Sequence, residues 1–368
     1  MEALNFIIPF IILISIVVFV HEFGHYYYAR KYGVRVTDFS IGFGKELFGW
    51  NDKYGTRWKV CLLPLGGYVK FYGDMNPASQ QENINNFPKD EQKFLFSTKT
   101  VFQRAVVVAA GPIANFVLAL IIFIFIFMVY GKDFSVPIIQ DVKNDSPAFK
   151  AGLKKGDQII LINNKEIKSI GEVSQNIMLS DNNLIKIVVL RDRKELLFNV
   201  EAISQETKDN FGNTITRKMI GIQIVPLNNQ INRQKLGPAK ALAAALSEIW
   251  FTISTTISYL GKMIIGTEKT DQLGGPIKIA QISGQVAELG IIPFLTIMAY
   301  ISISLGLINL FPIPLLDGGH LVFYLYEFIF KRPISEKIQN YFYKFGLFVL
   351  FSLMFFATYN DLKSLGLF

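Results

Sequence analysis

The sequence predicts an α-helical polytopic membrane protein with four transmembrane helices and one soluble β-rich domain inserted between the second and third. Hydrophobic residues make up 51% of the 368 residues, and the mean hydropathy is +0.34. Only 18% of the residues are charged, compared with about 25% in soluble domains. Such a composition is typical of a chain that lies largely in a bilayer and carries a water-soluble part.

Four apolar regions are long enough to cross a bilayer, which takes roughly 20 helical residues. They are Leu4 to about Tyr28, Ala105–Tyr130, part of Ile291–Phe330, and about Tyr341–Tyr359. The third region is too long for one straight span, and Pro312 and Pro314 remove backbone donors in its middle. We therefore expect one broken span followed by an interfacial extension over 313–330, and two separate spans are the alternative.

Positive charge predicts the orientation of these spans. The stretch 28–104 holds 12 Lys and Arg residues and the short connection 331–344 holds 4, so both loops are expected in the cytoplasm. Both termini and the long region 131–290 then lie outside the cytoplasm. These loops also explain the net charge of +8, because the sequence has no Arg-rich tract or aromatic–basic module. We expect the lipid bilayer as a partner and no nucleic acid.

The inserted region divides into a β domain and a helical connector. Residues 131–228 contain short apolar runs separated by turn residues. Within them, "SPAFKAGLKKGDQIILINNKEI" resembles the signature of a PDZ domain, with Asn164 where the pattern usually has Gly. Asn also adopts positive φ, so the turn is retained. We expect one PDZ domain that binds peptides at a sheet edge, and a β domain without a ligand is the alternative.

The connector at 229–290 includes a predicted helix over 237–266. Glu248 and Lys262 interrupt its apolar face. We therefore expect an amphipathic helix at the membrane interface rather than a fifth span.

The first apolar region contains "HEFGH". His21 and His25 are four residues apart and share one helix face, so both imidazoles can bind one zinc ion. Glu22 is then placed to take a proton from the attacking water and return it to the leaving amine. The motif is short, but each ionisable group inside a membrane costs about 3 kcal/mol or more. Three of them within five residues therefore indicate a functional site.

A catalytic zinc ion needs a third protein ligand and an open position. The single Cys, Cys61, excludes a Cys-based zinc finger and an intramolecular disulfide. Asp317 follows the double-Pro break, where an unwound helix must face protein or water, and it is the predicted third ligand. His320, the only other His, is the alternative.

The motifs occur together in one order along the chain: "HEFGH", "PLGGYVKFYGD", "GPIAN" and "NLFPIPLLDGG". With the PDZ-like region, they resemble the site-2 protease family of intramembrane zinc metalloproteases, and in particular its bacterial branch that regulates sigma E. The resemblance covers nearly the whole chain. It implies His21, His25 and Asp317 as zinc ligands and Glu22 as the general base.

The resemblance also implies a role near the site for Asn309, whose amide can donate to an oxyanion; contact between spans is the alternative role. Many relatives carry a further Asn at the position of Ser304. Gly111 and Asn115 in "GPIAN" are expected to let the second span pack closely against the first, which is a structural role.

Residues 57–73 are predicted to form two strands around a Leu-Gly-Gly turn. The resemblance implies that they form a membrane-dipping, re-entrant β-hairpin whose edge pairs with an extended substrate. An ordinary cytoplasmic hairpin is the alternative. The membrane part is thus expected to comprise 1–130, with the first two spans and this hairpin, and 291–368, with the last two.

The expected function is that of a zinc metalloendopeptidase in the bacterial inner membrane, with its PDZ domain on the periplasmic side. Its expected substrates are single-span membrane proteins, either anti-sigma factors or remnant signal peptides. An upstream site-1-type protease would cut first, in regulated proteolysis during a stress response. Enterobacterial relatives carry two PDZ domains and this chain has room for one. An ion transporter and a catalytically silent scaffold are the alternatives, although the order of the motif residues and the intact Glu22 argue against both.

Overall fold

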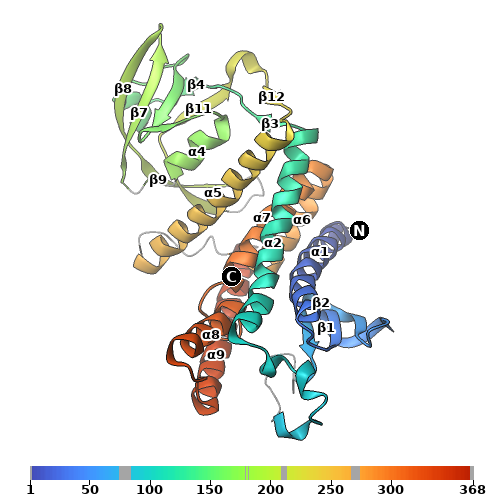
Figure 1. Ribbon diagram of the computed structural model, residues 1–368. Coiled ribbons are helices and arrows are strands. Elements are labelled where there is room, and N and C mark those ends of the chain that lie inside the picture. Colours follow the sequence, from blue (N-terminus) through green and yellow to red (C-terminus); the bar gives the residue numbers. More distant parts are fainter. Residues whose placement is uncertain are drawn as a thin grey trace. The chain divides into compact units, whose positions relative to one another are not determined.

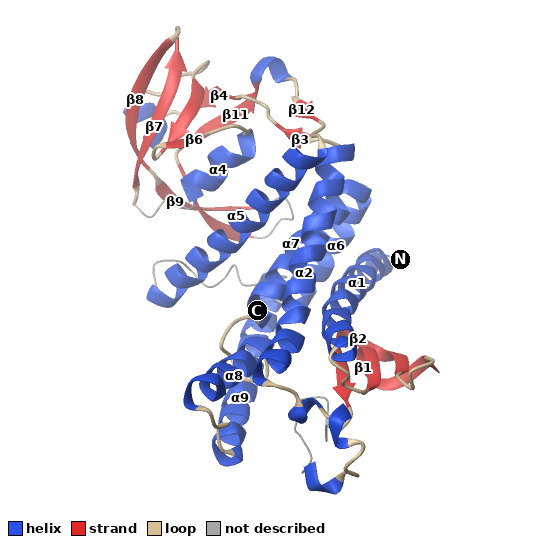
Figure 2. Cartoon of the chain, viewed as in Figure 1, coloured by secondary structure: helices blue, strands red, loops and turns tan. Residues whose placement is uncertain are grey.

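The computed structural model describes residues 2–73, 84–178, 180, 182–208, 214–266 and 274–364. The chain divides into two compact units (Figure 1). The first, here called the membrane unit, consists mainly of Met1–Ile122 and Gly274–Lys363, and the second, the inserted unit, mainly of Phe123–Leu273. The membrane unit is predominantly helical, with one β structure between its first two helices, whereas the inserted unit contains most of the strands (Figure 2).

Long apolar helices form most of the membrane unit. They are α1 (Glu2–Lys31), α2 (Val101–Val129, which continues into the inserted unit), α6 (Pro276–Glu288), α7 (Ile291–Asn309), α8 (Asp317–Phe330) and α9 (Glu336–Ser364). Short 3-10 turns at Ile84–Asn86, Gln92–Phe94 and Phe96–Thr98 precede α2. Small residues let α1 and α2 pack closely, because a Cβ atom on Gly24 would lie 2.3 Å from the carbonyl oxygen of Ala110.

Among the residues that the structure describes, five helices are long and apolar enough to cross a membrane. They are Asn5–Lys31, Val101–Val129, Pro238–Ile265, Ile291–Asn309 and Lys337–Lys363. Four correspond to the predicted spans. The fifth, α5 (Pro238–Ile265), is the least apolar of the five, and its location at the membrane interface remains a prediction.

The predicted break in the third apolar region is confirmed. Helix α7 ends at Asn309 and α8 begins at Asp317, with nonhelical backbone between them. The loop packs tightly on the first turn of α8, because a Cβ atom on Gly318 would lie 2.2 Å from the carbonyl oxygen of Phe311. Since α8 has 14 residues, it is about 21 Å long at 1.5 Å per residue, which is short for a separate span. This agrees with one broken span and a short extension.

The C-terminal helix α9 fixes the start of α6. The carboxylate of Asp361 accepts hydrogen bonds from the main-chain N–H groups of Gly275, Ile277 and Lys278, at 2.8, 3.0 and 3.2 Å. These groups have no partner within a helix that starts at Pro276, so a carboxylate is favourable there. Helix α6 in turn packs along α1.

The β structure after α1 differs from the predicted hairpin. Residues 57–73 do not pair with themselves; Arg57–Phe71 is one long strand, β2, which pairs with β1 (Val36–Asn51). Phe39 lies opposite Val69 and also opposite Trp58, so β1 separates the two halves of β2. The prediction was wrong because it took the Leu-Gly-Gly stretch as a hairpin turn. That stretch is a bend within β2, and the pairing partner lies earlier in the chain.

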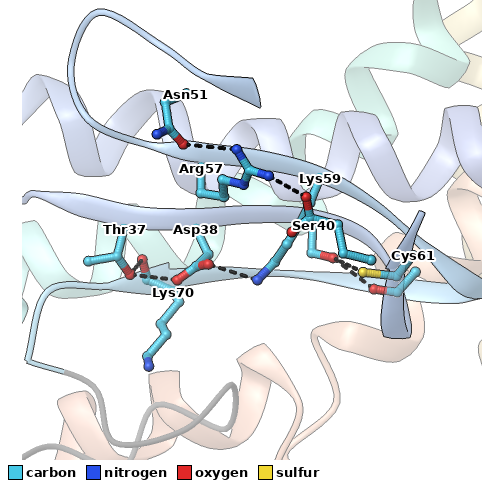
Figure 3. Close-up of polar contacts among 10 residues, drawn as sticks. Thr37, Asp38, Ser40, Asn51, Arg57, Lys59, Cys61 and Lys70 are labelled. Atoms are coloured by element: carbon cyan, nitrogen blue, oxygen red, sulfur yellow. Dashed lines mark hydrogen bonds and ion pairs between the residues drawn. The ribbon is translucent and has the colours of Figure 1, made fainter. Parts of the chain in front are cut away.

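Polar contacts hold this arrangement together (Figure 3). The hydroxyl of Thr37 donates to the carbonyl oxygen of Lys70 at 3.2 Å, on the second half of β2. The ammonium group of Lys59, on the first half, donates to Asp38 at 2.7 Å. The start of β1 is therefore held on both sides by side chains as well as by main-chain pairing.

The inserted unit is built on an antiparallel sheet with the strand order β11-β4-β5-β7-β8, and β6 pairs with β5. Its strands are β4 (Pro137–Val142), β5 (Gln158–Ile162), β6 (Lys165–Glu166), β7 (Leu184–Arg191), β8 (Lys194–Glu201) and β11 (Ile222–Pro226). Two further pairs are β9 (Ile203–Lys208) with β10 (Thr214–Met219), and β3 (Lys132–Asp133) with β12 (Arg233–Gln234). The helices α3 (Pro147–Ala151) and α4 (Ile170–Met178) and the turn Leu227–Asn229 precede α5.

An apolar core holds this unit together, with Ile159, Ile162, Ile185, Ile187 and Val189 almost fully buried. Because the side chains of a strand alternate between its two faces, the alternate residues of β7 at 185, 187 and 189 point to one face. The positive φ expected at the position of Asn164 is confirmed, with φ of 65°.

Candidate active site

Helices α1 and α8 bring three predicted site residues together in the membrane unit. His21 and His25 lie one turn apart on α1, with their Nε2 atoms 3.2 Å apart. Asp317 is the first residue of α8, and its Oδ2 atom lies 3.2 Å from Nε2 of His21 and 3.5 Å from Nε2 of His25. The three candidate ligand atoms therefore converge on one point from opposite ends of the chain.

The orientation of His25 is set by helix α2. Its Nδ1 atom lies 2.9 Å from the carbonyl oxygen of Val107. A carbonyl only accepts, so Nδ1 carries the proton and donates, and a neutral ring then has its lone pair on Nε2. Gly111 leaves room for the ring, because a Cβ atom there would lie 2.2 Å from Nε2 of His25.

Contacts between α8 and α2 hold Asp317 in place. The guanidinium of Arg104 donates to the carboxylate of Glu327 at 2.7 Å and lies 5.0 Å from the ring centre of Tyr324. The side chains of Arg104 and Glu327 are 13% and 18% exposed. This partly buried ion pair near the far end of α8 ties α2 to the helix whose first residue is Asp317.

The donor atoms of this cluster fit a zinc ion. Two imidazole nitrogens and one carboxylate oxygen are ordinary zinc ligands, and three protein ligands are typical of catalytic sites. Within the described residues, the buried Oδ2 atom of Asp317 has no hydrogen-bond partner. Once both Nε2 atoms are unprotonated, as metal binding requires, a carboxylate oxygen facing them is electrostatically unfavourable without a cation between them. His21, His25 and Asp317 would hold that cation.

Glu22 and the donor cluster open into one cavity of about 460 Å³. The Glu22 side chain packs against β2, since a Cβ atom on Gly67 would lie 3.0 Å from its Cγ. The cavity is lined by residues of α1, of the bend in β2, of α7 and α8, and of the break between them, including Val18, Glu22, Gly66, Gly67, Tyr68, Val69, Leu305, Asn309, Leu315 and Asp317. A space of this volume beside a buried carboxylate can admit part of a peptide chain and water.

The other predicted residues differ in their placement. Asn309, the last residue of α7, lies in the cavity with its amide nitrogen 3.5 Å from Nε2 of His21. His320 lines the cavity and packs beside the ring of Tyr343, but it is not part of the cluster of three donors. Ser304 is exposed and is not among the cavity-lining residues.

Sequence reasoning missed the contact that Asn115 makes with the site. Asn115 was expected only to aid helix packing, yet its fully buried amide lies 3.2 Å from Nδ1 of His21. An amide in an apolar span is costly, and this signal could have identified it. The carbonyl of Val107 gave no such signal, because any residue provides a main-chain carbonyl.

The site has the character of a metallopeptidase centre, and comparison with known proteins agrees. Residues 9–353 match the model of Peptidase family M50. A protein of Agrobacterium fabrum named as a zinc metalloprotease is 41% identical over 363 residues, which covers 98% of this chain and 96% of the relative. A Mesorhizobium japonicum protein, also named as a zinc metalloprotease, is 39% identical over 98% of this chain and 99% of its own length.

A third relative, Metalloprotease MmpA of Caulobacter vibrioides, is 34% identical over 98% of this chain and 96% of its own length. The chain therefore belongs to peptidase family M50, the site-2 protease family. It is a zinc-dependent metalloprotease and a membrane protein with several apolar helices.

Proposed function

We propose that this protein is an intramembrane endopeptidase that cuts single-span membrane proteins within or near their transmembrane segment. One observation carries the proposal. His21 and His25 lie on a helix long enough to span a bilayer, and Asp317 begins the helix that follows another such span. Ionisable groups at such positions are expensive unless they serve a function. In this proposal, the three residues are the zinc ligands.

Glu22 acts as the general base and then as the general acid. When bound, zinc supplies Lewis acidity to the scissile carbonyl and to the attacking water. Glu22 lies in the same cavity as the three ligands, where it takes the proton of the water and delivers it to the leaving amine. Glu22 follows His21 directly in the sequence and is not one of the three clustered donors.

Asn309 stabilises the negative charge that develops on the carbonyl oxygen. Its amide nitrogen is a hydrogen-bond donor that lies in the cavity, close to His21. A fixed donor at the site of developing charge commonly contributes about 3 kcal/mol to catalysis.

The substrate binds in an extended conformation along β2. A helical peptide bond is protected by its own hydrogen bonds, so cleavage requires local unwinding. Gly66, Gly67, Tyr68 and Val69 line the cavity, and residues 67–69 pair with β1 on one side only within the described chain. The edge of this stretch that carries no strand can hydrogen bond to an extended segment by strand addition, beside the carboxylate of Glu22, which is hydrogen bonded to the main chain of Val69. The exposed Leu47, Phe48, Leu62 and Leu63 support a sheet that dips into the membrane.

The inserted unit regulates access. Residues 131–228 act as a PDZ domain outside the cytoplasm, and residues 229–290 connect it to the last spans. The signature around Asp157 and the antiparallel sheet with two short helices support this assignment. We place the protein in a bacterial inner membrane, with the domain on the periplasmic side. There it excludes substrates with a bulky outer region until a site-1-type protease has shortened them. Anti-sigma factors of a stress response and remnant signal peptides fit this description.

The test is a Glu22→Gln variant, which removes the base and leaves all three ligands. Purified protein should bind zinc at the wild-type stoichiometry and fail to cut a model single-span substrate in detergent or liposomes. Glu288→Gln, an exposed carboxylate at the end of α6, is the matched control and should cut normally. Wild-type cleavage by Glu22→Gln would end the proposal, and zinc-independent ion flux in liposomes would favour a transporter.

A further inference from the structure

We propose that Asn115 is a positioning residue for the zinc ligand His21, acting as the hydrogen-bond acceptor of its Nδ1–H group. The inference rests on the proposed role of His21 and deepens it. A histidine that binds a metal through one ring nitrogen almost always donates its other ring N–H to an acceptor. His25 has such an acceptor in the carbonyl of Val107, whereas among the described residues Nδ1 of His21 faces the side chain of Asn115.

The amide of Asn115 is held at this point by its main chain. Asn115 is fully buried. Its main-chain carbonyl oxygen accepts a hydrogen bond from the hydroxyl of Ser302 on α7 at 2.8 Å. Gly306, one turn further along α7, allows the close approach, because a Cβ atom there would lie 3.3 Å from Cβ of Asn115. The side chain therefore has little freedom except rotation of the amide about its last bond.

The nitrogen and the oxygen of the Asn115 side-chain amide have different surroundings, and both are accounted for if the amide turns over. Its nitrogen faces Nδ1 of His21 at 3.2 Å, while its oxygen is buried and has no hydrogen-bond partner among the described residues. An amide nitrogen donates and cannot accept, so this orientation suits only a His21 with its proton on Nε2. A half-turn of the amide places the oxygen against Nδ1, where it accepts the Nδ1–H hydrogen bond.

The half-turned amide selects the ring form that zinc requires. With the proton held on Nδ1, the lone pair of His21 lies on Nε2, which faces Nε2 of His25 and Oδ2 of Asp317. The rotation also gives the buried amide oxygen a partner and moves the NH2 group to the position that the oxygen held. Asn115 thus accepts the Nδ1–H hydrogen bond of His21 as the Val107 carbonyl accepts that of His25. Unlike a main-chain carbonyl, the Asn115 side chain can be replaced by mutation.

The experiment compares three variants of the full-length protein in detergent by zinc competition with a chromophoric chelator. Asn115→Leu has a similar size and no acceptor, and it should bind zinc about 10–100-fold more weakly. Asn115→Asp has acceptor oxygens and no donor, and it should bind zinc within a few-fold of the wild type. Ser302→Ala loosens the same helix contact without changing the amide, and it should bind zinc normally.

The Asp variant decides the question even if the Leu variant does not fold. Zinc binding by Asn115→Asp as weak as that of a ligand deletion would overturn the acceptor role, since an amide that acts as a donor cannot be replaced by a carboxylate. Wild-type affinity in a folded Asn115→Leu would overturn it as well. Either result leaves the proposed protease intact so long as Glu22→Gln still binds zinc without cutting, whereas a wild type that binds no zinc would refute both.

Discussion

Two acidic side chains, Asp157 in the inserted unit and Asp317 in the membrane unit, have opposite surroundings. In the inserted unit, Asp157 is 1% exposed and receives a two-pronged ion pair from Arg191, at 2.6 and 2.7 Å, and a main-chain hydrogen bond from Lys154 at 2.9 Å. Hydrogen bonds to Asp157 raise the pKa of the Arg191 guanidinium above its ordinary value. In the membrane unit, the buried Oδ2 atom of Asp317 lies 3.2 and 3.5 Å from two imidazole nitrogens and, within the described chain, has no hydrogen bond.

This difference separates a structural acid from a functional one. A fully satisfied buried carboxylate stabilises the fold around it. A carboxylate oxygen that faces the lone pairs of ring nitrogens is repelled by them, and a bound cation removes this repulsion. The comparison predicts that substitution of Asp157 lowers the stability of the inserted unit without changing zinc binding. Substitutions around the His–Asp cluster are expected to lower zinc affinity.

The largest stability effect is expected at the ion pair of the inserted unit. Asp157→Ala leaves the charge of Arg191 without its partner and should destabilise the unit by about 3 kcal/mol. Hydrogen exchange of peptides from 137–226 should show the loss of protection, while zinc stoichiometry stays at the wild-type value. Glu166→Ala removes an exposed carboxylate paired with Lys168 and should change exchange little. A lower zinc stoichiometry in Asp157→Ala would contradict the purely structural role assigned to Asp157.

A smaller effect is expected from an added methyl group at the metal site. The Cβ atom of Gly111→Ala would meet the His25 ring at 2.2 Å, and such overpacking costs about 1–3 kcal/mol. Because the ring must move, zinc affinity should fall by about tenfold or more, as measured by chelator competition.

The control is Gly261→Ala on α5, where a Cβ atom has open space around it. It should leave zinc affinity unchanged and stabilise its helix slightly. Equal zinc affinity in the two variants would show that Gly111 does not control the position of His25.

The smallest effect is expected at the start of α3. The hydroxyl of Ser146 accepts a hydrogen bond from the main-chain N–H of Phe149 at 3.2 Å, which is an N-cap. Ser146→Ala should cost about 1 kcal/mol of stability in the inserted unit, and Ser146→Asp, which retains a cap, should cost less. Thermal unfolding followed by circular dichroism measures the difference, and identical curves for the two variants would refute the capping role.

Local sequence patterns predicted much of this molecule and failed where distant segments meet. The four apolar regions, the break before Asp317 and the positive φ of Asn164 were predictable because length, Pro and Asn act locally. The pairing of β2 with β1 was not, because a Gly-Gly stretch is compatible with both a turn and a bend.

The site shows the same division. The His21–His25 spacing gives two donors directly, and Asp317 could be inferred from its place after a double-Pro break. The contacts of Val107 and Asn115 with the two rings depend on how α2 packs against α1. Helix periodicity alone does not determine that packing, so the residues that orient the ligands were missed.

X-ray absorption spectroscopy at the zinc edge of the purified full-length protein tests the central claim most directly. The account predicts two imidazole nitrogens at about 2.0–2.1 Å and oxygen from Asp317 at about 2.0–2.2 Å, without sulfur. Asp317→Ala should lose the carboxylate signal and most of the bound zinc. Sulfur at about 2.3 Å, which only Cys61 or a Met could supply, or a zinc environment unchanged by Asp317→Ala, would contradict the account.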